Sequence, residues 1–429
     1  MKNYKLSVQP YKGTKDYFPL DMAKRNYLFN IWRQTAIEFG YEEYDTPIIE
    51  DANIYRAKSG DELANTQLYN FVDKGGREVA IRPEMTPSVA RLIAQKVNEL
   101  PKPIRWFSID KFYRYEKPQK GRSREFFQLN IDMFGIANIT AETEIFQFIN
   151  TVMEKIKAPK SSWKVYVNNR YLMDYLFEKI LKLKAEQIPQ VARAIDNFTK
   201  MEPNNFKDFL KDIGLDKLQI EKLMDFISMD LKGLYALKDQ SKGAEELIKL
   251  FDLCEQLELT NFEFKPYIMR GIAYYTGTVI EMFDVGSSEN PRALFGGGRY
   301  DDLLDIFDKP KIPAFGIGWG SVTMEDFMNT YKLFPDSTNI TTTKVLITLV
   351  NKKDLVKNME LANYLRSEGI NTENILEEND LRKQLSYGSK KKIPFVIFVE
   401  EDKYVVRDMT TGEQIEVAEK EDLIQHLTK

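Results

Sequence analysis

Cysteine and histidine are nearly absent from this sequence, with one residue of each among 429. With Cys254 alone, the chain can form neither an internal disulfide nor a thiolate metal cluster. With His426 alone, close to the C-terminus, a histidine-based catalytic triad and most zinc sites are excluded. The sequence also lacks apolar runs of the ~18–20 residues that cross a bilayer, and its first residues lack the apolar stretch of a secretory signal. We therefore expect a cytoplasmic protein with no membrane partner.

The sequence also has no large excess of acidic over basic residues, or of basic over acidic ones. Lysine and arginine number 61 and aspartate and glutamate 65, which gives a net charge of −4. Any contact with nucleic acid must therefore depend on local basic segments rather than on the overall field. Two such segments occur, KPQKGRSR at 117–124 and GSKKK at 388–392, and a solvated loop is the alternative explanation of each.

The common nucleotide-binding motifs do not occur. There is no GxxxxGK[ST] P-loop, and neither GGGRY at 296–300 nor GIGWGS at 316–321 matches GxGxxG. Both glycine-rich segments fall at expected strand–helix junctions. There they indicate either tight turns or places where bare backbone approaches a purine or a phosphate.

Residue patterns divide the chain into segments of different character, and its length predicts two to four domains. Apolar residues recur at helical spacing over 21–39 and again over 170–255, where a Lys- and Leu-rich composition predicts a separate helical module. A polar stretch at 335–343 resembles a linker. Beyond it, strands alternate with helices, which predicts a small domain with a mostly parallel sheet. Further strand-like segments occur at 104–116, 125–135 and 262–285.

Two arginines occupy segments in which a strand would bury them. Arg114 lies between two tyrosines, and Arg270 opens MRGIAYYTGTVIEMFD at 269–284, which we predict to be mostly strand. A buried guanidinium is unfavourable unless it is paired. An ion pair with Asp or Glu is one explanation. The other is a multiply charged ligand such as a polyphosphate, whose oxygens the guanidinium binds bidentately.

Polar residues alternate along the predicted strand at 125–135. Because strand side chains alternate with period 2, Gln128, Asn130 and Asp132 share one face, and the apolar residues between them share the other. The polar face is either solvated or lines a pocket.

The segment IRPEMTPSVARL at 81–92 places Glu84 and Thr86 in a proline-stiffened turn before an expected helix. A fixed carboxylate and hydroxyl suit an ammonium group. Capping of the helix by Thr86, followed by Pro87, is the alternative, and the two are compatible.

Five segments, taken together, resemble one protein family in the order in which they occur. They are YKGTKDYFP (11–19), IRPEMTPSVARL (81–92), FYRYEKPQKGRSREFFQLNIDMFG (112–135), RGIAYYTGTVIE (270–281) and GGGRYDDLL (296–304). They are similar to the histidyl-tRNA synthetases, which are class II aminoacyl-tRNA synthetases. The third segment resembles motif 2 of that class, and Arg270 to Tyr275 resembles a peptide distinctive of the histidine enzymes.

The resemblance implies an α+β catalytic domain with an antiparallel sheet flanked by helices, a helical insertion and a C-terminal α/β anticodon-binding domain. It also implies a homodimer with residues 21–47 at the subunit interface. The implied boundaries are 1–168 and 256–333 for the catalytic domain, 169–255 for the insertion, 334–343 for a linker and 344–429 for the anticodon-binding domain.

The resemblance further implies that ATP and histidine form histidyl-adenylate, from which histidine passes to tRNA(His), and that Mg²⁺ accompanies ATP without a metal site evident from the side chains. Arg114 and Arg270 then act as catalytic cations at the α-phosphate. The implied histidine-binding residues are Glu84, Thr86, Gln128, Asp132, Tyr274 and Tyr275. The implied ATP-binding residues are Arg114, Arg122, Gly298, Gly318 and Gly320, and the implied tRNA-binding residues are Lys117, Lys120 and Arg124.

Two positions depart from the family pattern. Many members have an acidic residue where this chain has Ala273, and motif 3 usually ends in an arginine at the γ-phosphate where this chain has Thr323. Arg122 and Arg124 are candidates for the missing cation. The alternative functions are a non-catalytic paralogue that serves as a regulatory or sensor subunit, a synthetase for another amino acid, and an RNA-binding protein on the same scaffold.

Overall fold

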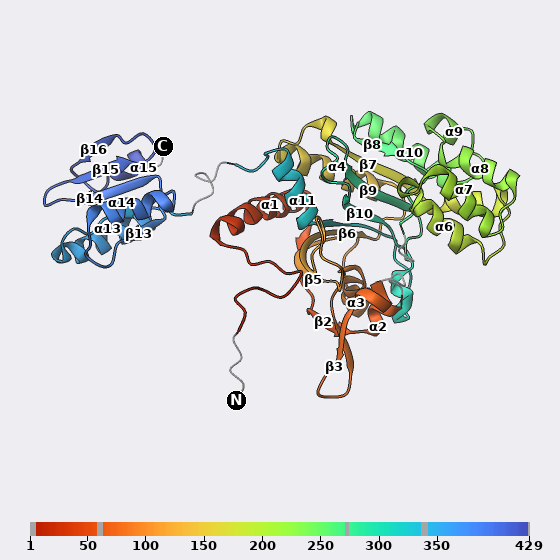
Figure 1. Ribbon diagram of the computed structural model, residues 1–429, viewed down its shortest axis with the longest axis horizontal. Coiled ribbons are helices and arrows are strands. Elements are labelled where there is room, and N and C mark those ends of the chain that lie inside the picture. Colours follow the sequence, from red (N-terminus) through yellow and green to blue (C-terminus); the bar gives the residue numbers. More distant parts are fainter. Residues whose placement is uncertain (1–5, 58–62, 271–273, 336–341, 428–429) are drawn as a thin grey trace. The chain divides into compact units, whose positions relative to one another are not determined.

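A computed structural model of the chain describes residues 6–57, 63–270, 274–335 and 342–427. The chain forms two compact units, a larger one of residues 1–16 and 28–333 and a smaller one of residues 17–27 and 334–429 (Figure 1). The predicted domain boundaries stay predictions, and most of the predicted linker, residues 336–341, lies outside the described residues.

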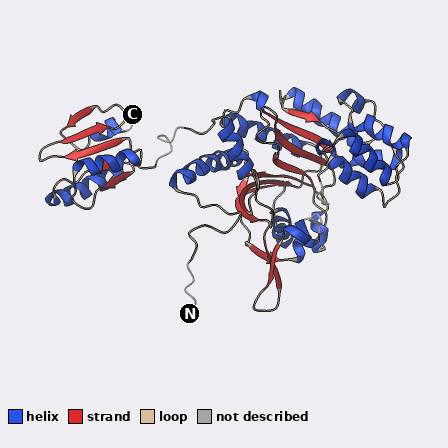
Figure 2. Ribbon diagram, viewed as in Figure 1, coloured by secondary structure: helices blue, strands red, loops and turns tan. Residues whose placement is uncertain are grey.

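The larger unit is built on an eight-stranded sheet with the order β1-β5-β6-β11-β10-β9-β7-β8 (Figures 1 and 2). The six strands from β5 to β7 in this order pair antiparallel, whereas β1 and β8 each join an edge in parallel. The antiparallel sheet implied by the family resemblance is therefore confirmed for the centre of the sheet. The strands are β1 Glu42–Glu43, β5 Ile104–Tyr113, β6 Glu125–Phe134, β7 Trp163–Asn169, β8 Phe262–Phe264, β9 Thr278–Asp284, β10 Ala293–Arg299 and β11 Ala314–Gly320.

The hairpin of β5 and β6 shows why the sequence pattern matters for the site. Leu129, Ile131 and Met133 are buried on one face of β6, as the alternation predicts. On the other face, Asn130 and Asp132 are also buried, each with 3% of its surface exposed. The polar face of this strand therefore lies inside the protein rather than in solvent.

Helices cover the sheet and supply its core. They are α1 Pro19–Glu38, α3 Thr86–Lys96, α4 Thr140–Lys155, α10 Lys242–Gln256 and α11 Ser321–Thr330. Helix α1 matches the predicted helix at 21–39 and ends before Gly40, whose φ of +76° suits glycine. Helix α3 buries Val89 and Ile93 in a cluster that also contains Phe112 and Tyr274, so this helix is fixed beside the hairpin.

A buried ion pair connects β10 to the start of α4. Arg299 donates to Glu142 from Nε at 2.7 Å and from Nη2 at 2.5 Å, and the two side chains are 5% and 0% exposed. The remaining donors of Arg299 reach the carbonyls of Ile136 and Asn138, both at 3.0 Å. Every arm of this guanidinium is thus used within the fold.

Helices predicted from the composition of residues 170–255 are present. They are α5 Arg170–Tyr175, α6 Ile188–Asp196, α7 Pro203–Asp212, α8 Lys217–Ile227 and α9 Leu231–Tyr235, followed by α10. Helices α6 to α9 form a cluster of their own in Figure 1. A capping box in which Asp216 and Gln219 each bind the other's backbone N–H starts α8.

A small three-stranded sheet in the larger unit was not predicted from the sequence. Its order is β2-β4-β3, and both pairs are antiparallel. The elements are β2 Ile49–Asp51, β3 Tyr69–Val72 and β4 Glu78–Ile81, with α2 Asn53–Arg56 between the first two strands. The sheet leads directly into the turn that carries Glu84.

The smaller unit has a five-stranded sheet with the order β13-β12-β14-β15-β16. The prediction of a mostly parallel sheet is wrong for half of the pairings, because β12 pairs in parallel with β13 and β14 whereas β14, β15 and β16 pair antiparallel. The elements are β12 Val345–Ile347, α13 Leu355–Ser367, β13 Thr372–Asn374, α14 Leu381–Lys390, β14 Phe395–Val399, β15 Tyr404–Asp408, β16 Gln414–Val417 and α15 Leu423–Leu427.

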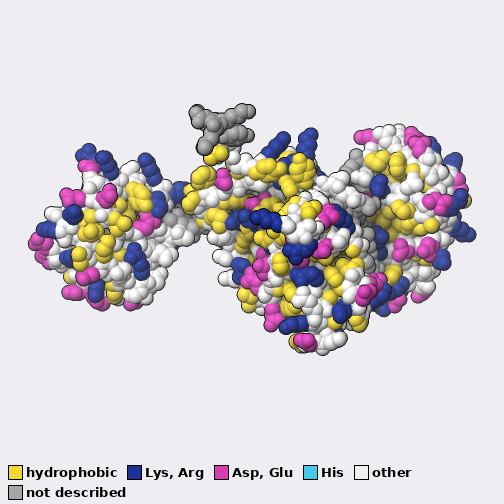
Figure 3. Space-filling view, turned by 90° about the horizontal axis from the view of Figure 1, so that it is seen from below, with side chains coloured by type: hydrophobic (Ala, Val, Ile, Leu, Met, Phe, Trp, Pro, Cys, Tyr) yellow, Lys and Arg dark blue, Asp and Glu magenta, His cyan; other side chains and the backbone are white. Residues whose placement is uncertain are grey.

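Surface charge follows the near-balance of the composition. Figure 3 shows acidic and basic side chains intermixed on the visible face of each unit. Among the described helices, none has the length and apolarity needed to cross a membrane.

Candidate active site

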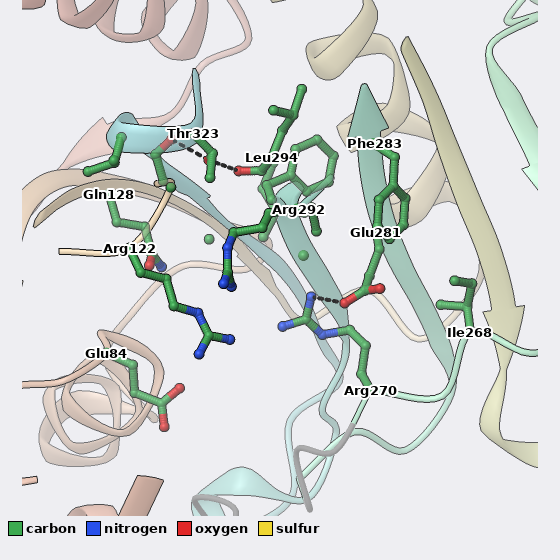
Figure 4. Close-up of a pocket in the computed structure, with 18 of the residues that line it drawn as sticks. Glu84, Arg122, Gln128, Ile268, Arg270, Glu281, Phe283, Arg292, Leu294 and Thr323 are labelled. Carbon is green, nitrogen blue, oxygen red and sulfur yellow. Dashed lines mark hydrogen bonds and ion pairs between the residues drawn. The ribbon is translucent and has the colours of Figure 1, made fainter. Parts of the chain in front are cut away.

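A cavity of about 810 Å³ opens over the polar face of the large sheet. Its walls come from the turn before α3, the loop between β5 and β6, the glycine-rich strands and the helical segment near residue 196 (Figure 4). Most of the predicted site residues line it. These are Glu84, Thr86, Arg114, Arg122, Gln128, Arg270, Tyr274, Tyr275, Gly318 and Gly320.

The two arginines predicted to act on phosphate both face this cavity, although neither lies within a strand. Arg114 follows the last residue of β5, and β9 begins only at Thr278, so the predicted strand at 269–284 is too long at its N-terminal end. Arg270 has a φ of +51°, a left-handed conformation that a strand does not contain. Residues 271–273, including Ala273, lie outside the described residues.

Arg270 combines an ion pair with unused donor capacity. Its Nη1 lies 3.1 Å from Oε1 of Glu281, and its guanidinium carbon lies 5.8 Å from the centre of the Tyr275 ring. Its buried Nε has no hydrogen-bond partner. The ion-pair explanation therefore applies to Nη1, and because Nε is buried, the arm that remains for a ligand is Nη2, which has no hydrogen-bond partner among the described residues.

The backbone around Arg270 is adapted to its side chain. A Cβ on Gly296 would lie 1.1 Å from Nη1 of Arg270, so any larger residue in this part of β10 would displace the guanidinium. Gly296 is thus required by close approach of a side chain, not by a turn.

Arg114 is held without a carboxylate. Its Nε donates to the carbonyl of Pro83 at 2.9 Å, and its guanidinium lies 5.2 Å from the Phe126 ring centre. No Asp or Glu forms an ion pair with Arg114 in the described ranges. Its remaining donors can therefore serve an anion in the cavity.

Glu84 and Thr86 lie together at the start of α3. Glu84 is 5% exposed and accepts a hydrogen bond of 3.1 Å from the Tyr274 hydroxyl. Thr86 is the first residue of α3, and the preceding Met85 occupies the N-cap position without a side-chain cap. The prediction that Thr86 caps the helix is therefore wrong, which leaves its hydroxyl for Tyr274 and the cavity.

Gln128 and Asp132 differ in how directly they reach the cavity. Gln128 lines it and donates to Oδ1 of Asn130 at 2.7 Å. Asp132 does not line it, because Tyr300 lies in front and donates a short hydrogen bond to Oδ1 of Asp132. Burial raises the pKa of Asp132 to about 7, while hydrogen bonds from Tyr300 and Tyr44 counteract part of that rise.

The glycines of the two glycine-rich segments mainly leave space for neighbouring side chains, and they do not form turns. GGGRY forms the C-terminal end of β10, Ala293–Arg299, which leads into the 3-10 helix η5 Leu303–Phe307, and GIGWGS spans the junction of β11 and α11, so both segments lie at strand–helix junctions as predicted. Gly298, predicted to contact ATP, lies outside the cavity lining, and its missing Cβ leaves room for the Tyr275 ring, 2.6 Å away. A Cβ on Gly318 would lie 2.0 Å from Nε2 of Gln128.

Among the basic residues at 117–124, in the loop between β5 and β6, Arg122 lines the cavity, and its Nε lies 3.1 Å from Glu116. Lys117 is exposed, and Lys120 lies 3.9 Å from Glu289. Arg124 stacks on Tyr115 at 4.1 Å and donates to the Tyr11 hydroxyl at 2.8 Å. Arg124 therefore points away from the cavity, which removes it as a candidate for the missing cation.

Comparison with known proteins decides the family. The profile described as Histidyl-tRNA synthetase matches residues 13–322, and the profile described as Anticodon binding domain matches residues 344–429. The chain belongs to the histidyl-tRNA synthetase family. A protein of Leptospira biflexa named Histidine--tRNA ligase is 40% identical over 96% of this chain and 94% of its own length. A protein of the same name from Thermoplasma volcanium is 32% identical over 99% of both chains.

Solved structures show the same fold. The crystal structure of histidyl-tRNA synthetase from Nostoc sp. PCC 7120 has a TM-score of 0.85 over 99% of each chain at 23% identity. The apo structure of the Staphylococcus aureus enzyme has a TM-score of 0.72 over 99% of this chain and 100% of its own. The implied fold class, including the C-terminal anticodon-binding domain, is confirmed.

Several residues of this family member's cavity were missed by the sequence reasoning. Tyr300, Glu281 and Arg292 line the cavity beside the predicted residues, and Asp196 and Thr199 reach it from the helical insertion. Tyr300 follows Arg299 in GGGRY, so the alternation of β10 could have indicated that the two point to different sides. No local pattern marks Arg292 or Asp196.

Proposed function

We propose that this chain activates histidine with ATP and transfers it to tRNA(His) through histidyl-adenylate. The observation that carries the proposal is the convergence of Arg114 and Arg270, which are 156 positions apart in the chain (270 − 114), on one cavity that also contains Glu84 and the tyrosine pair. The named relatives, matched over nearly their whole length, support an enzyme. Nothing found supports the alternative of a non-catalytic paralogue.

The first chemical step needs cations at the α-phosphate. The histidine carboxylate attacks phosphorus, charge accumulates on the phosphate oxygens, and pyrophosphate leaves. The free donors of Arg114 and Arg270 are fixed in place before the reaction, so they stabilise this charge without reorganisation. Mg²⁺ accompanies ATP in this proposal. Because no group of three or more candidate ligands occurs among the described residues, the phosphates themselves would be its main ligands.

Histidine would be recognised in two ways: its ammonium group by a negative charge and its imidazole by hydrogen bonds. Glu84, with Thr86 and Gln128 nearby, would hold the ammonium group. The imidazole would lie against Tyr275 and Tyr300, and it would reach Asp132 through the Tyr300 hydroxyl, which donates to that carboxylate. Partners for both ring nitrogens can reject other aromatic amino acids by ~10⁴–10⁵, because an analogue leaves a buried group unpaired.

The tRNA contacts and the assembly extend the proposal. Lys117, Lys120 and Arg124 would meet the acceptor end, and residues 344–429 the anticodon. A cytoplasmic homodimer is proposed through the segment at 21–47 and its surroundings. Ile37, Ile48 and Ile49, with 59%, 48% and 52% of their surfaces exposed, support an apolar contact there.

Substrate choice is tested by aminoacylation. We expect the purified chain to charge total tRNA with histidine and with none of the other standard amino acids, and to exchange pyrophosphate into ATP only when histidine is present. Both are measured with labelled substrates. Charging with a different amino acid would contradict the histidine assignment, and exchange with none of them would contradict the activity.

Asp132 predicts a pH dependence of histidine binding. Its pKa of about 7 means that the carboxyl group holds a proton below that pH and accepts hydrogen bonds fully only above it. We expect the KM for histidine to decrease as the pH rises through about 7. Asp132→Asn should raise this KM at high pH. It should also remove the part of the pH dependence of KM that the titration of histidine itself does not explain. Identical pH profiles for the two proteins would contradict the role of Asp132.

A further inference from the structure

Arg292 is a guanidinium in the cavity that has no carboxylate within ion-pair distance among the described residues. It precedes β10 and lines the cavity together with Thr323 and Leu294 (Figure 4). In the described part of the chain it forms no ion pair, unlike Arg122 with Glu116 and Arg270 with Glu281. An unpaired, partly buried arginine in a concave site indicates an anionic ligand.

The two carboxylates that precede Arg292 in the sequence do not supply the missing partner, because Glu289 lies 3.9 Å from Lys120 and Asp284 is held by its own loop. Asp284 also lines the cavity, but it accepts hydrogen bonds from Tyr331 at 2.7 Å and Asn290 at 2.8 Å. Its backbone donors, the N–H groups of Gly286 and Ser287 at 3.1 Å, complete its coordination. The hydrogen bonds of Asp284 therefore stabilise the loop that leads to Arg292, and none of them involves Arg292 itself.

A second guanidinium adds to the positive charge. Burial lowers the pKa of Arg292 from its ordinary value, and the neighbouring charge of Arg122 lowers it further, with Glu116 opposing both. Two like charges in one hollow are unfavourable without a counter-ion. Figure 4 shows Arg122, Arg270 and Arg292 pointing into the same space from three sides. A terminal phosphate, which carries the most charge in a nucleoside triphosphate, suits the pair of Arg122 and Arg292.

The position of Arg292 relates it to the departure at Thr323. A Cβ on Gly121 would lie 2.9 Å from Cδ of Arg292 and 3.5 Å from Cγ2 of Thr323, so both side chains pack at the same point of the basic loop. The Thr323 hydroxyl donates to the carbonyl of Leu294 at 3.0 Å and so fixes the start of β10. Thr323 has no charge to offer the nucleotide, whereas the guanidinium beside it does.

We propose that Arg292 binds the terminal phosphate of ATP and supplies, from the residue before β10, the cation that position 323 in α11 lacks in this chain. The inference rests on the proposed function. It assigns Arg122 a supporting role, because its pair with Glu116 uses part of its charge.

Two variants of similar length separate charge from packing. Arg292→Met keeps an unbranched stem against Gly121 but removes the charge, and Arg292→Lys keeps the charge without the planar fork. We expect Arg292→Met to raise the KM for ATP in histidine-dependent pyrophosphate exchange by about ten- to hundredfold, the loss expected for a charge-assisted hydrogen bond. The KM for histidine should change by less than about twofold on the same grounds, and Arg292→Lys should fall between the parent and Arg292→Met. Arg77→Met, at a side chain that is 79% exposed, is the matched control.

Nucleotide binding without histidine or tRNA makes the assignment independent of turnover. Calorimetry should show that Arg292→Met loses affinity for ATP but keeps the parent's affinity for AMP, which has no terminal phosphate. Equal losses for ATP and AMP, or an unchanged affinity for ATP, would overturn the inference while leaving amino acid activation intact. Failure of the parent chain to exchange pyrophosphate would instead overturn the proposed function.

Discussion

Replacing Arg270 with alanine should slow histidyl-adenylate formation by about two to three orders of magnitude, equivalent to ~3–4 kcal/mol of transition-state stabilisation. The guanidinium is positioned by Glu281 at 3.1 Å, by the Tyr275 ring and by the space that Gly296 leaves. Among its guanidinium nitrogens, only Nη1 is paired within the described part of the chain. Most of the hydrogen-bond donors of Arg270 are therefore not used within the protein, and we expect them to bind the substrate.

The measurement is single-turnover adenylate formation, with circular dichroism to show that the variant is folded. Because Arg270→Ala also removes the ion pair with Glu281, the double variant Arg270→Ala, Glu281→Gln separates loss of the cation from the effect of the carboxylate charge that stays behind. Both variants should be slow if the cation matters. Recovery of near-parental rates in the double variant would refute a direct role for Arg270.

Arg114→Ala provides the parallel experiment on the opposite wall. Arg114 has no carboxylate partner among the described residues and is held by the Pro83 carbonyl, so its removal leaves no buried charge behind. We expect a loss of similar size in the rate of adenylate formation. Arg77→Ala, on the exposed turn between β3 and β4, should keep the parental rate.

The sequence was most informative where the spacing of apolar residues within one helix or strand determines which side chains are buried. Alternation along 125–135 correctly separated Leu129 and Ile131 from Gln128 and Asp132, because successive side chains of β6, which pairs with β5 and β11 at its two edges, project to opposite faces of the sheet. The helical period of 21–39 likewise located α1 to within two residues at its start. Both patterns depend only on the geometry of one element, so a single sequence contains them.

Contacts between distant residues could not be derived in this way. The position of Tyr300 between Asp132 and the cavity depends on β10 and β6 lying on either side of β11, an order that no local pattern specifies. The glycines of β10 were interpreted as turn residues. Gly296 and Gly298 instead leave room for the side chains of Arg270 and Tyr275, which belong to a segment before β9 and so give no local signal in β10. In the small sheet, the helices between the strands correctly predicted the parallel pairs. The antiparallel pairing of β14, β15 and β16 was missed, although the short connections between these strands favour it.

The buried pair of Arg299 and Glu142 is expected to give the largest effect on stability. Removing one partner of such a pair leaves a buried charge without its main counter-charge and typically costs about 3–5 kcal/mol. Arg299 also lies 3.4 Å from Asp301, so Glu142→Gln should fall at the lower end of this range. Arg299→Met and Glu142→Gln should therefore each lower the free energy of unfolding of the larger unit by an amount in this range, measured by denaturant titration followed by circular dichroism. The exposed pair of Lys211 and Asp208, whose side chains are 64% and 65% exposed, is the control, and breaking it should change stability by less than about 1 kcal/mol.

The double variant Arg299→Met, Glu142→Leu tests why the single changes destabilise. If the cause is the unpaired charge, the double variant should lose less than the sum of the two single losses, since neither charge remains buried. Strictly additive losses would contradict this explanation and point to packing instead. Two carbonyls before α4 would still lose their donor, so some destabilisation should persist. Because Tyr300 follows Arg299 directly, any remaining loss of histidine affinity in the double variant would show that the ion pair also positions the tyrosine in front of Asp132.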